Sequence, residues 1–370
     1  MKFTCDIKSL NDACNNVMRA VSTKVTIPTI EGILLECGSD TLSLTGYDFE
    51  FGINTILSAT VAEPGAIVIN AKILCDIVRK ISGQTVMFEV NGTSVLITAG
   101  AKQYNISGID AEDYPELPSV SGGYPLFINQ GILQQMVSQT LFAVADNESS
   151  KPVHTGLKFE MTQNQLRLIG VDGYRLAIRT ETIKYDGEDV TFIVPKKTIR
   201  ELIKLMDSDT DKDISVSVGR RHIVFEVDNY SIISRLLDGD FLDYNAAVPK
   251  TSKTTVLINT SDALDCIEST IPVIENNAKN PIRVLFDADE MRVSTVSVLG
   301  RSIDYTHANV SGERVEIGFN SKYVLDALNA ADTDQVRIEL NGPVSPVKIL
   351  PVNDDSYLFL VLPMRLKNEV

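Results

Sequence analysis

The chain alternates between two hydrophobic patterns, and their order recurs three times. Apolar residues at every second position predict half-buried strands, as in Val86–Val90, Ile223–Val227 and Val336–Leu340. Turn residues such as Asn91-Gly92 follow each of these strands. Elsewhere a short apolar strand leads directly into a segment with helical periodicity, and the predicted helices cover 71–81, 196–206 and 321–330.

Two markers show that the chain is a tandem repeat. The residues before these helices, Asn70, Pro195 and Asn320, lie 125 residues apart. A second marker recurs at intervals of 124 and 125 residues, as Leu42–Asp48, Leu166–Asp172 and Met291–Ser297. An earlier predicted helix precedes each second marker, over 7–21, 130–145 and 261–275. The strands lie too close together for helical crossovers, which predicts an α+β fold with three tandem copies of one unit, each with antiparallel sheet and two helices on one face.

Segments rich in proline, glycine and serine separate the units, over 113–125 and 243–253. We therefore expect domains at 1–121, 122–250 and 251–370. Units of this size are complete domains, so they can close into a ring as well as form an open solenoid. Two chains would supply twelve helices, and a spacing of about 10 Å would place their axes on a circle roughly 38 Å across. Subtracting a helix radius of about 5 Å on each side leaves room for duplex DNA.

The net charge and the positions of the basic residues limit which classes of partner the protein can bind. The formal net charge of −15 disfavours simple adhesion to nucleic acid. Basic residues nevertheless gather on the second helices of the first two units, with Lys196, Arg200 and Lys204 at i, i+4 and i+8, and the third unit offers Lys322. We expect the residues facing DNA to be Lys24, Lys72, Arg79, Lys80, Lys196, Lys197, Arg200, Lys204 and Lys322. The alternative is that these residues are only the solvated side of amphipathic helices. The first helix of the third unit, which carries Asp262, Asp265 and Glu268, breaks the basic pattern.

Other classes of protein find little support. The N-terminus turns polar at once, and the longest apolar stretch, Tyr357–Met364, is too short to span a membrane, so we expect a cytoplasmic protein. The five cysteines have no metal-ligand spacing and indicate reduced core thiols, with no metal and no cofactor. No phosphate-binding loop, nucleophile elbow or zinc-protease motif occurs, which predicts no catalytic residue. An acid–base role for Asp172 and Arg175 is the enzyme alternative, but Asp48 and Asp172 more simply indicate turn residues that bond their own backbone.

Two segments resemble the bacterial sliding clamp family, the beta subunit of the replicative DNA polymerase III holoenzyme. Val171-Asp-Gly-Tyr-Arg-Leu-Ala177 resembles that family's T-D-[GS]-[HY]-R-L-A segment, and Tyr357–Leu366 resembles its C-terminal [VM]-[ML]-P-[MV]-R-L. The resemblance covers the whole chain. It implies a non-catalytic processivity factor that encircles duplex DNA as a head-to-tail homodimer. It also implies an ATP-driven clamp loader, a replicative polymerase and other partners that carry a Gln-Leu-x-Leu-Phe-like peptide. A scaffold that binds only proteins is the alternative.

The resemblance also implies two further sets of residues. The partner-peptide pocket would comprise Gly173, Tyr174, Arg175, Leu176, Leu242, Asn320, Tyr323, Val344, Pro346, Leu360, Val361, Leu362, Pro363, Met364, Arg365 and Leu366. Pro363 should end the last strand, and methionine at 364 suits a cleft that serves several partners. The subunit joint would comprise Gln103, Ile106, Ile109, Ile271, Pro272, Val298, Ile303 and Tyr305. Val171, Ala246, Ala247 and the extension 367–370 depart from the family pattern and bear on pocket affinity.

Overall fold

The computed structural model describes residues 1–22, 27–120, 126–146, 151–185, 187–207, 211–274 and 281–366. Its secondary structure repeats one order three times: strand, helix, three strands, and then the same again. Side-chain oxygens set where several helices begin. Asp6, Asn70, Asn259 and Asn320 each accept a backbone N–H two or three residues ahead, as N-cap residues do.

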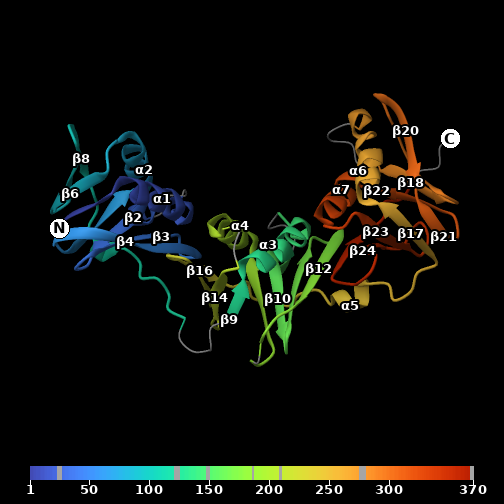
Figure 1. The fold of residues 1–370 in the computed structure, drawn as a ribbon, viewed down its shortest axis with the longest axis horizontal. Helices are drawn as coiled ribbons and strands as arrows, with labels where there is room; N and C mark the ends of the chain where they lie inside the picture. The colour runs from blue at the N-terminus through green and yellow to red at the C-terminus, as the bar shows by residue number, and fades with distance from the viewer. Residues whose placement is uncertain are drawn as a thin grey trace. The chain divides into compact units, whose positions relative to one another are not determined.

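The first copy contains ten elements, and its helices α1 and α2 lie side by side on one face of the sheet (Figure 1). They are β1 (Lys2–Asp6), α1 (Ile7–Val17), β2 (Gly32–Cys37), β3 (Thr41–Tyr47), β4 (Phe51–Glu63), β5 (Gly65–Asn70), α2 (Ala71–Lys80), β6 (Thr85–Asn91), β7 (Ser94–Ala99) and β8 (Lys102–Ser107).

The second copy has the same order. Its elements are β9 (Leu126–Asn129), α3 (Gln130–Ser138), β10 (Gly156–Thr162), β11 (Gln165–Val171), β12 (Arg175–Thr182), β13 (Val190–Pro195), α4 (Lys196–Leu205), β14 (Asp213–Val218), β15 (His222–Val227) and β16 (Tyr230–Arg235). The short helix α5 (Tyr244–Ala247) follows, within the segment that the sequence marks as a boundary.

The third copy adds one short strand to the pattern, and its helices α6 and α7 again pack together (Figure 1). Its elements are β17 (Thr254–Asn259), α6 (Thr260–Glu268), β18 (Ile282–Asp287), β19 (Glu290–Ser297), β20 (Gly300–His307), β21 (Asn309–Gly312), β22 (Val315–Phe319), α7 (Ser321–Ala330), β23 (Gln335–Leu340), β24 (Val347–Pro351) and β25 (Tyr357–Val361).

The strands form three antiparallel sheets among the described residues. One runs β8-β7-β6-β1-β4-β16-β15-β14-β9. Off this path, β3 pairs with β4 and with β2, and β2 also pairs with β5. The second runs β13-β10-β11-β12-β25-β24-β23-β17-β21, and the third β20-β19-β18-β22. The first two sheets cross from one repeat to the next. Accordingly, the chain divides into two compact units, Met1–Gly131 with Lys197–Leu236 and Ile132–Lys196 with Leu237–Val370. The domain boundaries that we expect from the sequence stay a prediction.

Glycine in the repeated marker has a packing reason. A Cβ added at Gly46 would lie 2.5 Å from the carbonyl oxygen of Val17, and one at Gly170 would lie 2.4 Å from that of Thr140. Val17 is the last residue of α1, and Thr140 lies two residues beyond α3, so the end of the first helix approaches this strand too closely for a side chain. The third copy has Thr295 at this position, which is buried.

The first helix of each copy is shorter than predicted. The helices α1, α3 and α6 are followed by 3₁₀ turns at Met18–Ala20, Leu141–Ala143 and Ile271–Val273. Hydroxyl groups accompany two of these ends, because Thr140 donates to the Met136 carbonyl and Thr270 to the Ile267 carbonyl, both at 2.7 Å. Apolar residues continue at helical spacing past each end, so periodicity alone could not place it.

The five cysteines are buried, free thiols, as predicted. Among the described residues, none of the helices has both the length and the apolar character needed to cross a lipid bilayer.

Candidate peptide-binding site and basic helix faces

An aspartate turn presents the first pocket residues. One carboxylate oxygen of Asp172 accepts the backbone N–H groups of Tyr174 at 2.9 Å and Arg175 at 3.0 Å. Asp48 holds the matching turn in the first copy, with the N–H groups of Glu50 and Phe51. Both aspartates are thus the turn residues that the sequence predicts.

Arg175 has a structural role in the site and is not exposed to a partner. Its side chain is 8% exposed; Nε donates to Asp172 at 2.9 Å, and Nη1 donates to Asp326 on α7. The guanidinium carbon lies 4.7 Å from the ring centre of Tyr323. Tyr174 stacks on the same ring with a centroid distance of 5.9 Å, yet it remains 61% exposed. Arg175 therefore fastens α7 to the turn, and Tyr174 is the member of this cluster open to a partner.

Strand alternation divides the predicted pocket residues between two faces of one sheet. Leu176 pairs with Leu360, and both are buried with Ile169, Val171 and Tyr244 in a small apolar cluster. Val361 instead belongs to the core of the third copy beneath α6 and α7. The prediction that Val361 lines the peptide pocket is therefore wrong. Neighbouring side chains in a strand point to opposite faces, so Val361 and Leu360 cannot line the same one.

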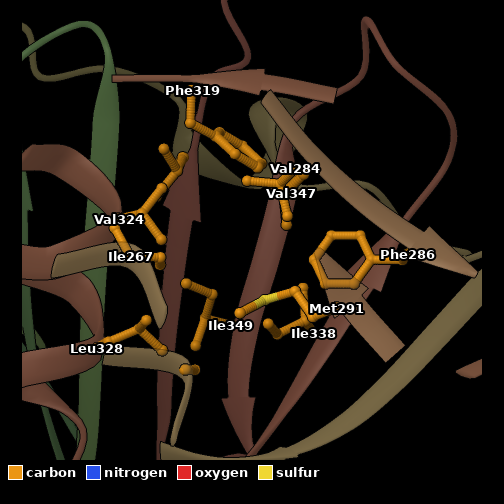
Figure 2. Close-up of a pocket in the computed structure, with 12 residues that line it drawn as sticks. Ile267, Val284, Phe286, Met291, Phe319, Val324, Leu328, Ile338, Val347 and Ile349 are labelled. Carbon is orange, nitrogen blue, oxygen red and sulfur yellow. The ribbon is translucent and has the colours of Figure 1, made fainter. Parts of the chain in front are cut away.

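A small cavity lies in that core, and Val361 is among its lining residues. The cavity has a volume of about 20 Å³. Figure 2 shows side chains such as Phe286, Met291 and Phe319 directed into it, and all twelve lining residues are apolar. A site of this size and chemistry is a packing void, far smaller than a ligand pocket.

The C-terminal segment is held by backbone hydrogen bonds on both sides. The N–H of Leu362 donates to the Tyr174 carbonyl at 2.9 Å, and the N–H of Met364 donates to the Gly318 carbonyl at 2.8 Å. A Cβ at Gly318 would lie 2.6 Å from the Met364 carbonyl oxygen and 2.7 Å from the Leu366 side chain. Strand β25 ends at Val361, close to Pro363 as predicted. The half-buried side chain of Met364 thus lies where the segment crosses β22.

The remaining predicted pocket residues have varied surroundings. Asn320 caps α7 through the N–H of Lys322. Pro346 lies beside Leu362, since Val347 pairs with Val361. Leu242 is partly exposed, next to Phe241, which packs on the apolar cluster. Val344, Arg365 and the turn residue Gly173 are exposed.

A polar network fixes α5 on this sheet, and we did not predict it from the sequence. The Tyr244 hydroxyl donates to Glu160 at 2.6 Å and accepts from Arg167 at 3.1 Å. Burial tends to raise the pKa of Glu160, but hydrogen bonds from Lys158 and Tyr244 and the nearby positive charges outweigh it and lower this pKa. The segment that we expected to be a domain boundary is therefore part of the site, and the aromatic Tyr244 within a polar segment was the one signal in the sequence.

The basic residues of α4 are exposed at a different spacing from the predicted one. Lys197, Arg200 and Lys204 are exposed at i, i+3 and i+7. Lys196 is only 8% exposed, and its ammonium donates to the Val144 carbonyl at 2.6 Å and to Asp146 at 2.7 Å. The prediction that Lys196 faces DNA is therefore wrong, because the residue that follows the strand turns inward.

The other predicted DNA-facing residues fall into two groups. Lys72, Arg79 and Lys80 on α2 and Lys322 on α7 are exposed. Acidic neighbours partly neutralise these positive charges. The guanidinium of Arg79 lies 3.5 Å from the Asp76 carboxylate, and the ammonium of Lys197 lies 2.6 Å from the Asp48 carboxylate. Lys24 lies outside the described residues.

The predicted joint residues lie mainly on two sheet edges. Gln103 and Ile106 belong to β8, and Ile303 and Tyr305 belong to β20, each the end strand of its sheet. Ile271, Pro272 and Val298 are exposed near β20. Ile109 differs from the prediction, because it exchanges two backbone hydrogen bonds with Val68 of its own chain and packs on Tyr47 and Tyr114.

Comparison with known proteins identifies the fold. Models of the DNA polymerase III beta subunit match in order: its N-terminal domain over residues 1–118, its central domain over 127–243 and its C-terminal domain over 245–365. The beta sliding clamp of Bacillus subtilis is 30% identical over 99% of this chain and 100% of its own length, and that of Staphylococcus epidermidis is 32% identical over 99% of both. A crystal structure of the Bacillus subtilis DNA polymerase sliding clamp has a TM-score of 0.95 at 30% identity, covering 99% of this chain and 100% of its own. These matches confirm the predicted fold class of three tandem clamp domains and the non-catalytic class of protein. The chain belongs to the DNA polymerase III beta subunit family, the beta sliding clamps.

Proposed function

We propose that this protein is a DNA sliding clamp that works as a head-to-tail homodimer closed around duplex DNA. In this role it tethers the replicative DNA polymerase, and an ATP-driven loader places it on DNA. The match of all three family domains, in order and over nearly the whole chain, carries the proposal. A scaffold that binds only proteins is the competing function, and the experiment below separates the two.

The exposed bases on α2, α4 and α7 support contact with DNA. Each lies on the second helix of its copy, so the three copies present equivalent basic positions. Loose contacts between these side chains and phosphates would carry no sequence information. Such contacts exchange readily, which suits a clamp that must slide.

Topology gives the sharpest test of the ring. We expect the purified protein, once loaded, to remain on closed circular DNA through gel filtration in high salt. Cutting the circle at one site should release it, because only the closed duplex prevents escape. The measurement is the protein that co-elutes with DNA before and after cleavage. Equal retention on both forms would contradict encirclement, and no retention on either would favour the scaffold.

We further propose that the turn at Tyr174 and the C-terminal segment bind the partner peptide. Tyr174 and Leu362 are exposed and joined by a backbone hydrogen bond, two residues before Met364. Leu242 is exposed next to Phe241, which packs on the cluster that contains Leu176 and Leu360. A Gln-Leu-x-Leu-Phe-like peptide would add its own apolar side chains to this surface. The hydrogen bonds that hold Leu362 and Met364 keep the segment ordered before binding, which lowers the entropic cost of association.

Substitution of Tyr174 and Met364 by alanine should weaken binding of such a peptide at least about tenfold, since a few anchors dominate interfaces of this kind. Fluorescence polarisation of a labelled peptide measures the change. Phe127→Ala is a matched control, because Phe127 is exposed and apolar and lies on β9, outside the site. Leu176→Ala is a poor probe, because removal of a buried leucine costs about 2–5 kcal/mol of stability. Unchanged affinity in the folded double variant would refute the assignment.

A further inference from the structure

Three neighbouring arginines lie where β4 pairs with β16, away from the second helices. Arg220 and Arg221 are in the turn between β14 and β15, and Arg235 is the last residue of β16. All three side chains are exposed, and within the described ranges no ion pair joins them to a carboxylate. Acidic residues outnumber basic ones by 49 to 34 in this chain. Arginines that nevertheless lack a carboxylate partner therefore need an explanation of their own.

Backbone pairing and electrostatics both show that these arginines are close together. His222 pairs with Arg235 across the two strands, and the N–H of Leu236 donates to the Arg221 carbonyl at 2.8 Å. Burial lowers the pKa of His222, and the guanidiniums of Arg235 and Arg221 lower it further. Both positive charges therefore act on the same imidazole, and one bound anionic group can reach both.

The arginine at the end of β16 lies on the face of the sheet opposite α4. The hydroxyl groups of Ser234 and of Thr198 on α4 lie 2.7 Å apart. Side chains alternate along a strand, so Arg235, the next residue, points to the other face. His222, its partner across the strands, shares that face. The sheet lies between these side chains and α4, so duplex DNA that contacts the exposed residues of α4 does not reach them.

An exposed aromatic ring belongs to the turn between β3 and β4, in a conformation that suits glycine. Phe49 has a φ of +71°, which bulky residues rarely adopt, and its side chain is 45% exposed. The matching residue in the second copy is Gly173, with a φ of +92°. The Tyr47 hydroxyl donates to the Phe49 carbonyl at 3.1 Å, and the two rings lie 5.7 Å apart. Folding would be better served by glycine here, so the ring indicates contact with a ligand.

The same backbone frame forms the proposed peptide site in the other unit. The N–H of Arg235 donates to the Glu50 carbonyl at 2.8 Å, and the N–H of Leu362 donates to the Tyr174 carbonyl at 2.9 Å. The pairing of β4 with β16 has the register of β12 with β25, so Arg235 and Leu362 are equivalent positions. One frame therefore presents an apolar surface in one unit and guanidinium groups beside an aromatic ring in the other.

We propose that Phe49, Arg220, Arg221 and Arg235 form an arginine surface that binds an acidic peptide segment of a partner protein. Guanidinium groups bind carboxylates through paired hydrogen bonds. An apolar side chain within the acidic segment would pack on the ring of Phe49. This inference goes beyond the proposed clamp function, since it adds a second class of peptide at a separate place in the fold.

Single-stranded nucleic acid fits this surface less well than a peptide does. Its bases need successive aromatic rings to stack on, and the arginine surface offers Phe49 alone among the described residues. Glu50 is exposed next to that ring and would repel a neighbouring phosphate. A peptide can place its carboxylates against the arginines and a neutral residue beside Glu50.

Charge reversal tests the arginines. The probe is a fluorescently labelled peptide, Asp-Glu-Phe-Glu-Asp, and fluorescence anisotropy measures its binding. Arg221→Glu combined with Arg235→Glu should weaken binding at least about tenfold at low salt, because like charges then face each other. Lys250→Glu combined with Lys253→Glu is the matched control, with the same change in net charge at exposed positions elsewhere. The control should bind the probe nearly as the wild type does.

Phe49→Gly separates binding from folding. Glycine adopts a positive φ without strain, so this variant should unfold at the same urea concentration as the wild type or at a higher one. It should still bind the probe at least about fivefold more weakly, because an apolar anchor is lost. A lower unfolding midpoint with unchanged affinity would show that Phe49 serves packing only and would overturn its role in binding.

The remaining outcomes separate this inference from the proposed function. Equal affinity of the wild type and the arginine variant, or no binding of the probe to the wild type, would overturn the proposal. Labelled oligothymidylate that binds more tightly than the probe, and is lost in the same variant, would assign the surface to single strands instead. Retention of the arginine variant on closed circular DNA should match the wild type. Failure of the wild type to remain on the circle would overturn the clamp function and leave the arginine surface untouched.

Discussion

Replacement of Lys197, Arg200 and Lys204 by alanine should weaken binding of duplex DNA at least about tenfold at low salt. The three side chains form one exposed stripe on α4, and a homodimer would lose six positive charges in total. Each lysine or arginine that contacts a phosphate contributes about one unit to the salt slope of log K. Fluorescence anisotropy of labelled duplex over a range of salt concentrations gives both the affinity and the slope, and loading by a clamp loader should fall in parallel.

Two comparisons make this result specific. Lys184, Lys250 and Lys253 are exposed lysines outside the second helices, so their replacement by alanine changes the net charge equally. This control should bind DNA nearly as the wild type does. Lys196→Ala should instead lower the free energy of unfolding by about 1–3 kcal/mol, because the buried Val144 carbonyl loses its donor. Equal losses of affinity in the stripe variant and the control would show that only net charge matters.

The sequence predicted the architecture well because the repeat was visible in two independent markers. Every predicted second helix begins where expected, since a strand, a cap and an amphipathic pattern coincide at Asn70 and Asn320. The ends of the first helices could not be predicted, because the approach of Gly46 and Gly170 to a helix end is a tertiary contact. Local patterns show where a helix can form but not where packing stops it.

The site was predictable in part, because local sequence motifs marked two of its segments. The motif around Asp172 located the turn, and the apolar tail located β25. The burial of Lys196 and the separation of Val361 from Leu360 depend on which way one residue faces at an element boundary. Gly318 carried a usable signal, since glycine inside a strand often marks a close backbone approach. Asp326, which holds Arg175, carried none.

Arg175→Ala should lower the free energy of unfolding by about 3 kcal/mol. Removal of one partner from a buried ion pair costs about 3–5 kcal/mol, because the remaining charge is left uncompensated. The lower end applies here, since Asp326 is partly exposed and solvent relieves some of its charge. Asp172 also keeps its backbone hydrogen bonds. Urea unfolding followed by circular dichroism measures the change.

Two further variants show whether the loss of stability in Arg175→Ala comes from the carboxylates left without their partner. Arg175→Ala combined with Asp326→Ala should regain part of the stability, because one unpaired carboxylate is gone. Tyr174→Ala should leave stability almost unchanged, because its ring is mostly exposed, while still weakening the peptide complex. A loss of stability in Tyr174→Ala as large as that in Arg175→Ala would mean that the aromatic stack, and not the ion pair, fastens α7 to the turn. We expect the opposite pattern, in which Arg175→Ala lowers stability and Tyr174→Ala does not. This result would show that Arg175 holds the site together and that Tyr174 contacts the partner.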